Sequence, residues 1–321
     1  MLSVPTTIGT SHKEMNHHIK IQQELEKIHM AGTPLIEATE LKSVIDSGAD
    51  VVLLDVRWAL GDPDGHQHYL DGHIPGAIFV DLHHELAGVA SEETGRHPLP
   101  DPEEFQAAAR RWGINRGSTV IVYDATRALA AARAWWLLRH AGFENVRVLN
   151  GGLDAWTGSG HRLETGEVTA IPGHVELGWN QLPVINIQEA QDFPGALLDA
   201  RAHERYTGVT EPIDPRAGHI PGALSHPTTD NLADDGRFLP TEELTSSFAE
   251  LGIQPDAQAD ATGGNRTDTT PAVASYCGSG VTASHQILAL HTIGINAALY
   301  PGSWSQYSAE ATRTAATGER P

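Results

Sequence analysis

The stretch Gly72–Ala77 reads Gly-His-Ile-Pro-Gly-Ala, and the same six residues return at Gly218–Ala223. Two other segments recur in the same order around it: Leu53–Arg57 returns as Leu197–Arg201, and residues 146–156 return more loosely as residues 297–307. The copies lie roughly 145 residues apart, which is far longer than the repeat unit of a solenoid protein. The chain is therefore predicted to contain two copies of one domain.

Within each copy, segments typical of strands alternate with segments typical of helices. Val51–Val56, Val120–Tyr123 and Val146–Leu149 are short, continuous apolar runs, as expected of strands buried on both faces, and Ala128–His140 favours a helix. This alternation predicts an α/β fold in which each domain has a parallel sheet flanked by helices on both faces. Ligands of such folds bind beyond the carboxyl ends of the strands.

The repeat also suggests the domain boundaries. We predict a first domain at residues 34–156, a linker at 157–181, a second domain at 182–308 and a polar tail at 309–321. Residues 1–33 have no counterpart in the second copy and are expected to be a partly disordered extension. Residues 255–271 are polar and of low complexity, which predicts a flexible surface loop.

Composition excludes several classes of function. The 321-residue chain carries 21 Lys and Arg against 41 Asp and Glu, a formal net charge of −20. Such a surface repels nucleic acids and anionic membranes, so neither is an expected partner. The sequence has no apolar run long enough to span a membrane and no secretory signal. A single cysteine cannot form an internal disulfide, which fits a cytoplasmic protein.

That cysteine, Cys277, is the candidate nucleophile. It lies between the β-prone run Ala272–Tyr276 and the helix-prone run Ala283–Leu290, with Gly278 and Gly280 beside it. Unpaired amides at a helix start stabilise an anion, and the glycines let several N–H groups converge on one sulfur atom. The alternative is an inert buried cysteine, which is the usual fate of a free thiol.

The first copy of the domain lacks this nucleophile. Tyr123 and Tyr276 fix the alignment of the two copies, and it places Asp124 where the second copy has Cys277. The first copy also lacks the Gly-x-Gly that follows the cysteine. We interpret this asymmetry as duplication followed by loss of chemistry in the N-terminal half.

Together these motifs resemble the two-domain rhodanese-family sulfurtransferases. The resemblance covers about residues 34 to 308. It rests on Leu-Asp-x-Arg and Gly-His-Ile-Pro-Gly-Ala in both copies, on Cys-Gly-Ser-Gly-Val-Thr, and on Tyr-Pro-Gly-Ser-Trp-Ser near the end. It implies two tandem rhodanese-like domains, the first inactive and the second catalytic, with sulfur carried as a persulfide on Cys277. The persulfide and substrate loop is then formed by Gly278, Ser279, Gly280, Val281 and Thr282.

The same resemblance implies the reaction partners. A small molecule donates the sulfane sulfur, a thiol or cyanide accepts it, and a thioredoxin-like reductant is a further candidate; no cofactor is implied. Covalent catalysis of this kind needs one activated cysteine and no resolving cysteine nearby. The histidines at 66, 68, 73, 83 and 84 are irregularly spaced and lack soft ligands beside them, so no metal site is predicted.

The loop also bears on the choice of donor. Thiosulfate-type members of the family carry basic side chains after the cysteine, whereas mercaptopyruvate-type members resemble the loop found here, so 3-mercaptopyruvate is favoured and thiosulfate is the alternative. A carboxylate donor would need an arginine from elsewhere, since arginine forms bidentate pairs with carboxylates. Arg201 and Arg205 are the candidates, with Arg216 behind them. Arg201 could instead pair with Asp199, because Arg57 recurs in the inactive copy.

Ser279 is a candidate proton relay for the departing enolate, with His73 and a carboxylate as partners. His73 is repeated as His219, however, which favours a structural role in the turn for both histidines.

A cysteine loop after a strand also occurs in two rival classes of protein. A cysteine phosphatase or arsenate reductase needs Cys-x5-Arg, but the sixth residue after Cys277 is Ala283. A non-catalytic persulfide carrier stays open on sequence grounds.

Overall fold

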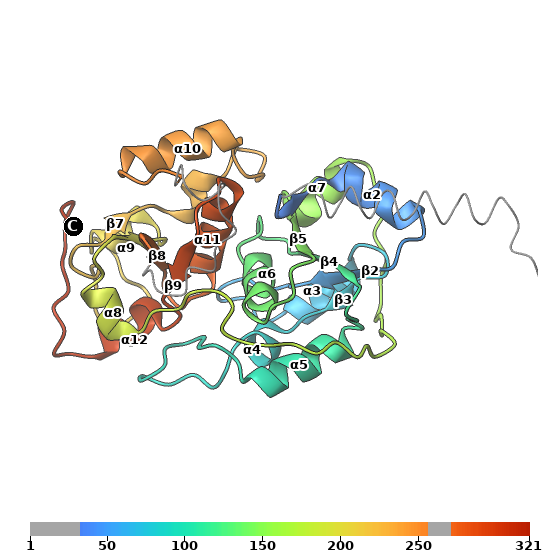
Figure 1. Cartoon of the computed structure of the whole chain (residues 1–321), viewed down its shortest axis with the longest axis horizontal. Coiled ribbons are helices and arrows are strands. Elements are labelled where there is room, and N and C mark those ends of the chain that lie inside the picture. The colour runs from blue at the N-terminus through green and yellow to red at the C-terminus, as the bar shows by residue number, and fades with distance from the viewer. Residues whose placement is uncertain (1–32, 256–270) are drawn as a thin grey trace, which may run out of the picture.

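The computed structural model describes residues 33–255 and 271–321 of the chain. The predicted extension and the polar insertion therefore lie almost wholly outside the described residues. Two α/β units lie side by side, and the helices α6 and α11 pack against each other between them (Figure 1). In the described residues, no helix is both long and apolar enough to cross a membrane.

The N-terminal unit is built on a parallel sheet in the order β1-β5-β4-β2-β3. The strands are β1 (Leu35–Ile36), β2 (Val51–Asp55), β3 (Ile78–Phe79), β4 (Thr119–Tyr123) and β5 (Val146–Leu149). The helices are α2 (Ala38–Asp46), α3 (Gly65–Asp71), α4 (Leu82–Glu85), α5 (Pro102–Arg111), α6 (Ala131–His140) and α7 (Gly152–Gly158). Side chains of α2 and α7 pack on one face of the sheet, and those of α5 and α6 pack on the other.

The C-terminal unit repeats this plan with a parallel sheet in the order β7-β6-β8-β9. Its strands are β6 (Ala196–Asp199), β7 (Leu224–Ser225), β8 (Val273–Tyr276) and β9 (Ala297–Leu299). Its helices are α8 (Ile187–Gln191), α9 (His203–Tyr206), the 3-10 helix η1 (Thr228–Asn231), α10 (Thr241–Glu250), α11 (Thr282–Thr292) and α12 (Ser303–Ala309). The predicted fold, two parallel sheets with helices on both faces, is confirmed.

One hydrophobic core is shared by the two units. Residues of the N-terminal sheet and α6 belong to the same buried cluster as residues of the C-terminal sheet and α11. Each sheet has a separate core on its other face. The inner face of each unit is therefore covered by the other unit, and elements from both meet where the two sheets face each other.

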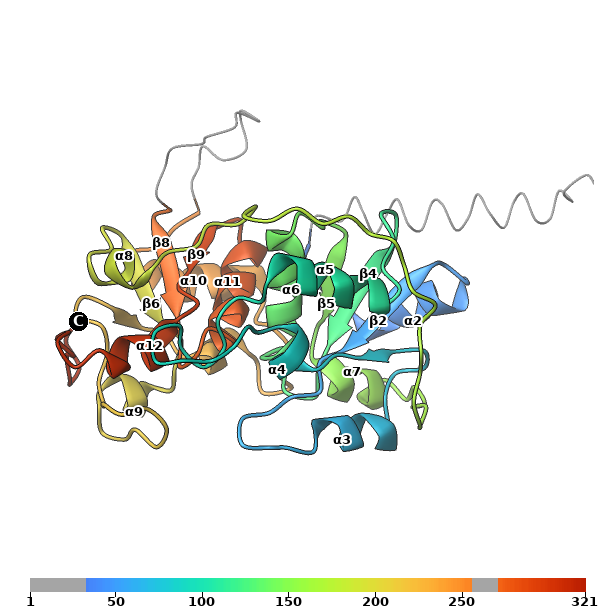
Figure 2. The ribbon, with the colours of Figure 1, turned by 90° about the horizontal axis from the view of Figure 1, so that it is seen from below.

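The predicted linker packs on the surface of the protein through backbone hydrogen bonds. Backbone amides along it bond to the N-terminal unit, for example Glu164 N to His73 O at 2.8 Å and Gly173 N to Arg110 O at 2.8 Å. The linker then reaches the second sheet, where Ile185 N donates to Leu299 O at 2.9 Å. Figure 2 shows it running along the two units. The hydrogen bonds of residues 157–181 fasten the linker to the N-terminal unit, and the residues just after it pair with the second sheet.

One predicted boundary was displaced. The helix expected to start at Ala128 begins at Ala131, because Arg127 and Ala128 adopt the left-handed conformation with φ of 61° and 68°. The physical cause is the neighbouring Asp124. Its carboxylate accepts hydrogen bonds from backbone amides of this segment, and these bonds hold the backbone away from helical geometry.

Candidate active site

Cys277 lies directly after β8 and before α11, at the carboxyl end of the second sheet. Its side chain is buried, with 1% of the residue exposed. The Gly280 amide donates to Sγ at 3.1 Å, and the Cys277 amide donates to Ser303 Oγ at 3.1 Å. Of the several N–H groups predicted to converge on the sulfur atom, one, the amide of Gly280, contacts it in the structure.

Gly280 is required by the path of the loop. Its φ is 83°, and a Cβ atom there would lie 2.4 Å from the Pro301 carbonyl oxygen. Any side chain would therefore push the loop away from Pro301 and strain the backbone. The second glycine of the Gly-x-Gly thus turns the chain so that its amide can point at the thiol.

A segment of the N-terminal unit reaches across to this loop. The connection between α4 and α5 extends to the neighbourhood of α12 (Figure 2). There Arg96 N donates to Ser305 Oγ at 3.1 Å, and Gln306 Nε2 donates to Glu93 O at 2.5 Å. A Cβ on Gly95 would lie 2.6 Å from Gly302 O, so the approach of the two backbones depends on glycine. This brings Arg96 and His97 to the cysteine loop.

Ser279 contacts His97, through a distance of 2.8 Å between Oγ and Nδ1. His97 Nε2 lies 3.2 Å from His83 Nδ1, and Trp58 Nε1 donates to His83 Nε2 at 3.0 Å. An indole N–H can only donate, so His83 carries its ring proton on Nδ1 and donates to His97 Nε2. His97 then donates from Nδ1 to Ser279, which leaves the serine hydroxyl hydrogen free for another acceptor.

The environment of His97 keeps it uncharged. Burial lowers its pKa to about 3, and the neighbouring His83, Arg133 and Arg96 act in the same direction. A neutral His97 is consistent with the one-directional chain of hydrogen bonds. Ser279 is therefore set up to donate a hydrogen bond and not to be deprotonated by a histidine.

Two arginines flank Gly278 on the other side of the loop. A Cβ placed on Gly278 would lie 3.1 Å from Arg96 Nη2 and 3.4 Å from Arg205 Nη1. Arg205 is paired with Glu211 at 2.7 Å and with Asp214 at 3.0 Å, and Arg96 is paired with the same Asp214. The Arg96 and Arg205 side chains are 31% and 15% exposed, so neither side chain is fully buried.

The other arginine candidates are engaged elsewhere. Arg201 is 4% exposed, and its guanidinium donates to Asp199 Oδ2 and to Gly218 O, both at 2.6 Å, and to Glu211. Arg57 contacts Asp55 and Gly72 O in the same way in the first copy. The structure therefore places Arg201 in its alternative role, the ion pair.

Arg216 likewise has a structural role. Its guanidinium donates to four backbone carbonyls, those of residues 307, 308, 310 and 313. These bonds hold the C-terminal segment after α12 against the loop that carries Arg216. Of the three candidate arginines, only Arg205 lies beside the cysteine loop.

His73 does not meet Ser279. Its Nδ1 contacts Tyr69 O at 2.9 Å, and its ring stacks on that of Tyr69 with the centroids 4.2 Å apart. His219 repeats this arrangement with Tyr206, at 2.8 Å and 3.7 Å. Both histidines therefore shape the Gly-His-Ile-Pro-Gly turn. The expected partner of Ser279 was wrong: the hydrogen bond goes to His97, which has no counterpart in the second copy of the motif.

Asp124 fills the position that Cys277 occupies in the other unit. Its Oδ1 accepts from the amides of Thr126 and Ala128 at 2.8 and 2.9 Å, and its Oδ2 accepts from those of Ala130 and Ala131 at 2.8 and 2.9 Å. The residue is fully buried. The first copy thus has four amides arranged around an anion, and the anion is the carboxylate of its own Asp124.

Sequence reasoning missed the contributions of the N-terminal unit, namely Arg96, His97 and Arg133. Arg133 comes from α6, is fully buried, and donates to Gly280 O at 3.2 Å. A sequence signal existed for Arg133, because a charge stands inside an otherwise apolar helical run, Ala-Arg-Ala-Trp-Trp-Leu-Leu. The repeat marks the segment that carries Arg96, because Gly95-Arg96 and Leu99-Pro100 return as Gly236-Arg237 and Leu239-Pro240, although His97 itself is not repeated.

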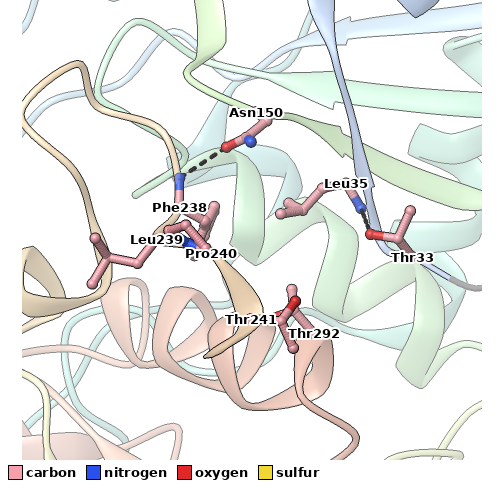
Figure 3. Close-up of a pocket in the computed structure, with 8 residues that line it drawn as sticks. All are labelled: Thr33, Leu35, Asn150, Phe238, Leu239, Pro240, Thr241 and Thr292. Atoms are coloured by element: carbon pink, nitrogen blue, oxygen red, sulfur yellow. Dashed lines mark hydrogen bonds between the residues drawn. The ribbon is translucent and has the colours of Figure 1, made fainter. Parts of the chain in front are cut away.

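A cavity of about 550 Å³ lies elsewhere between the two units (Figure 3). Its lining residues are Thr33, Leu35, Asn150, Phe238, Leu239, Pro240, Thr241 and Thr292. Thr292 ends α11, whereas Cys277 lies just before that helix begins. The cavity also has no titratable side chain in its lining. It is therefore separate from the cysteine site.

Comparisons with known proteins agree with this geometry. The Rhodanese-like domain family matches residues 37–159 and again residues 184–310. The chain is 44% identical to "Putative thiosulfate sulfurtransferase SseB" of Mycobacterium tuberculosis, covering 89% of this chain and 98% of the relative. It is 43% identical to "Probable 3-mercaptopyruvate sulfurtransferase" of Pseudomonas aeruginosa, covering 90% and 100%.

A solved structure shares the whole arrangement. The crystal structure of SseA from Escherichia coli, one of the 3-mercaptopyruvate sulfotransferases, matches with a TM-score of 0.71 and 35% identity, over 85% of this chain and 99% of that one. The chain therefore belongs to the rhodanese family of sulfurtransferases, with two rhodanese-like domains in tandem.

Proposed function

We propose that the protein is a 3-mercaptopyruvate sulfurtransferase that carries sulfur as a persulfide on Cys277. The observation that carries the proposal is the make-up of the loop and its surroundings. The loop itself brings no positive charge, while Arg96 and Arg205 flank Gly278 and Ser279 offers a free hydroxyl hydrogen. This set suits a small donor with a carboxylate at one end and a carbonyl oxygen near the sulfur atom.

The carboxylate would bind to the two guanidinium groups. Arg96 and Arg205 share Asp214, so either arginine can exchange this acid for the donor's carboxylate while the other keeps its partner. A guanidinium can hold a carboxylate through two parallel hydrogen bonds. Because the thiol is buried, the side chains around it must move for the donor to reach it.

In the first half-reaction, the Cys277 thiolate attacks the donor's sulfur atom. A sulfur–sulfur bond forms, the donor's carbon–sulfur bond breaks, and its electron pair moves into the enolate of pyruvate. A proton then converts the enolate to pyruvate. Charge develops on the carbonyl oxygen, and the Ser279 hydroxyl is free to donate a hydrogen bond to it. Donors aimed at developing charge in a buried site are the kind of group that accelerates such a step.

In the second half-reaction, an acceptor attacks the outer sulfur atom of the persulfide and regenerates the thiolate. A thiol would leave as a persulfide and cyanide would leave as thiocyanate, which makes the kinetics ping-pong. A thioredoxin-like dithiol could serve as acceptor, because its second thiol can release the sulfur as sulfide. We place the reaction in the cytoplasm, where a reducing environment keeps the single cysteine available.

Thiosulfate is the second candidate donor. The relative from Mycobacterium tuberculosis is named for thiosulfate, and a guanidinium pair can also hold a sulfonate. Thiosulfate releases sulfite, however, so no enolate forms and the hydroxyl of Ser279 has no carbonyl oxygen to stabilise. The arrangement of Ser279 and His97 therefore favours 3-mercaptopyruvate.

Kinetics with both donors tests the proposal. We expect kcat/KM for 3-mercaptopyruvate to exceed that for thiosulfate by at least about tenfold, the effect of one lost hydrogen bond to a charged group. Cys277→Ser should abolish transfer from both donors while leaving the fold intact. A preference for thiosulfate would refute the donor assignment, and turnover with neither donor would favour the non-catalytic persulfide carrier.

A further inference from the structure

The helix α6 of the inactive domain presents a fully buried arginine, Arg133, to the cysteine loop. Its Nη1 donates to Gly280 O at 3.2 Å, and the amide of the same Gly280 donates to Cys277 Sγ at 3.1 Å. The guanidinium and the sulfur atom are thus joined through one residue of the loop. This places a positive charge from one domain behind the nucleophile of the other.

Arg133 has no carboxylate partner among the described residues. Its other hydrogen bonds also go to backbone carbonyls: Nε to Leu86 O at 3.2 Å, and Nη2 to His97 O at 3.2 Å and Pro98 O at 3.1 Å. Carbonyls satisfy the donors but do not neutralise the charge. A buried charge without a counter-charge is costly, so its retention in the core calls for an anion nearby.

Other charges near the loop nearly cancel. Arg96 and Arg205 at Gly278 are matched by Glu211 and Asp214, and all four of these belong to one network of ion pairs. His97 is neutral, since burial lowers its pKa to about 3. Arg133 is therefore the uncompensated cation of this region in the described part of the chain.

We propose that Arg133 is the counter-charge that holds Cys277 as a thiolate and, under the proposed function, holds its persulfide as an anion. Two observations on Arg133 support this. Burial lowers its pKa to about 10, which leaves the guanidinium protonated at neutral pH, and the neighbouring Cys277 acts in the opposite direction. The same guanidinium also fixes the carbonyl of His97, so it positions the residue that contacts Ser279.

The test measures the charge state of the thiol directly. Because the chain has a single cysteine, the ultraviolet absorbance of the thiolate across a pH range, minus that of Cys277→Ser, reports this residue alone. In Arg133→Gln the pH midpoint should rise by about one to two units, the usual effect of removing an opposite charge close to an acid. Arg133→Lys keeps the charge and should stay near the parent midpoint.

Arg139→Gln is the matched control. Arg139 is on the same helix, and its guanidinium lies over the Trp135 ring at 5.9 Å from the centroid. Its loss changes the net charge equally and should leave the midpoint unchanged. The proposal is overturned if Arg133→Gln leaves the midpoint within about 0.3 units of the parent, or if Arg139→Gln moves it as far.

A second measurement needs no change at Arg133 and can still overturn the proposal if Arg133→Gln does not fold. The stability of the unaltered protein relative to Cys277→Ser should increase from about pH 5 to pH 9, because a thiolate held by a counter-charge favours the folded state. A difference that does not change with pH overturns the proposal. Neither measurement uses a sulfur donor, so the result does not depend on whether 3-mercaptopyruvate is the substrate.

Discussion

Replacing Asp124 by asparagine tests whether the inactive domain depends on its filled cradle. The change is nearly isosteric, but it replaces one carboxylate oxygen by an NH2 group. Each oxygen of Asp124 accepts two backbone amides, so either orientation of the asparagine leaves two amides facing a donor. The residue is fully buried, so water does not replace the lost acceptor.

The cost follows from these contacts. A buried donor left without an acceptor costs about 1 to 3 kcal/mol, so two of them cost about 2 to 6 kcal/mol. The segment also contains Arg127 and Ala128 in the left-handed conformation, with φ of 61° and 68°. Such residues persist only where surrounding contacts hold them, so weakening the carboxylate contacts releases the backbone. We expect Asp124→Asn to lower the free energy of unfolding by about 4 kcal/mol.

Urea unfolding followed by tryptophan fluorescence measures this cost. Five of the seven tryptophans lie within residues 37–159, so the signal reports mainly the N-terminal domain. Asp154→Asn is the control, since Asp154 is exposed and its loss should change stability by less than about 0.5 kcal/mol. A cost below about 1 kcal/mol for Asp124→Asn would show that the four amides do not depend on the carboxylate.

Three further predictions concern the catalytic site and its surroundings. Arg96→Ala and Arg205→Ala should each raise KM for 3-mercaptopyruvate about tenfold with a smaller effect on kcat, because each removes a charge-assisted contact that is partly exposed. An unchanged KM in both variants would exclude the two arginines from the donor site. Ser279→Ala should lower kcat for 3-mercaptopyruvate by at least about tenfold and leave thiosulfate turnover unaffected; an equal loss with both donors would point to a damaged loop. Burial lowers the pKa of His97 and of His285 to about 3, so below about pH 6.5 the folded state binds fewer protons than the unfolded state. As the pH is lowered from there, the free energy of unfolding should decrease by up to about 1.4 kcal/mol per pH unit for each histidine. A free energy of unfolding that stays constant down to pH 4 would contradict this.

The parts of the fold that sequence could predict are those encoded locally. The apolar runs of β2, β4 and β5 identify a buried parallel sheet, and the position of Cys277 between a strand and a helix follows from the chain itself. The exact start of α6 could not be predicted, because the carboxylate of Asp124, seven residues before Ala131, accepts hydrogen bonds from the amide of Ala131 and from amides before it. Local helix propensity gives no sign of such a contact.

Comparing the two copies of the domain helps to separate structural residues from candidates for chemistry. Arg201 and His73 each have a counterpart in the other copy, and both make the same structural contacts as that counterpart. Arg205 has no clear counterpart, and it lies beside Gly278. Among these three arginines and histidines, the two that are repeated make structural contacts, whereas Arg205, which is particular to the second copy, lies beside the cysteine loop.

Comparing the two copies does not identify the residues that the N-terminal domain contributes to the site. Their contacts to the site join residues that are far apart in the chain. His97 and Ser279 are 182 positions apart, and Arg133 and Gly280 are 147 apart. Such pairs exist only once α6 packs on α11 across the shared core. The first copy lost its nucleophile and closed its own cradle with Asp124, yet its helix and its α4–α5 connection supply a charge, a hydrogen-bond donor and an arginine to the other cradle. The second domain alone would hold the thiol and its loop but not these groups, so under the proposed function both domains build the active site.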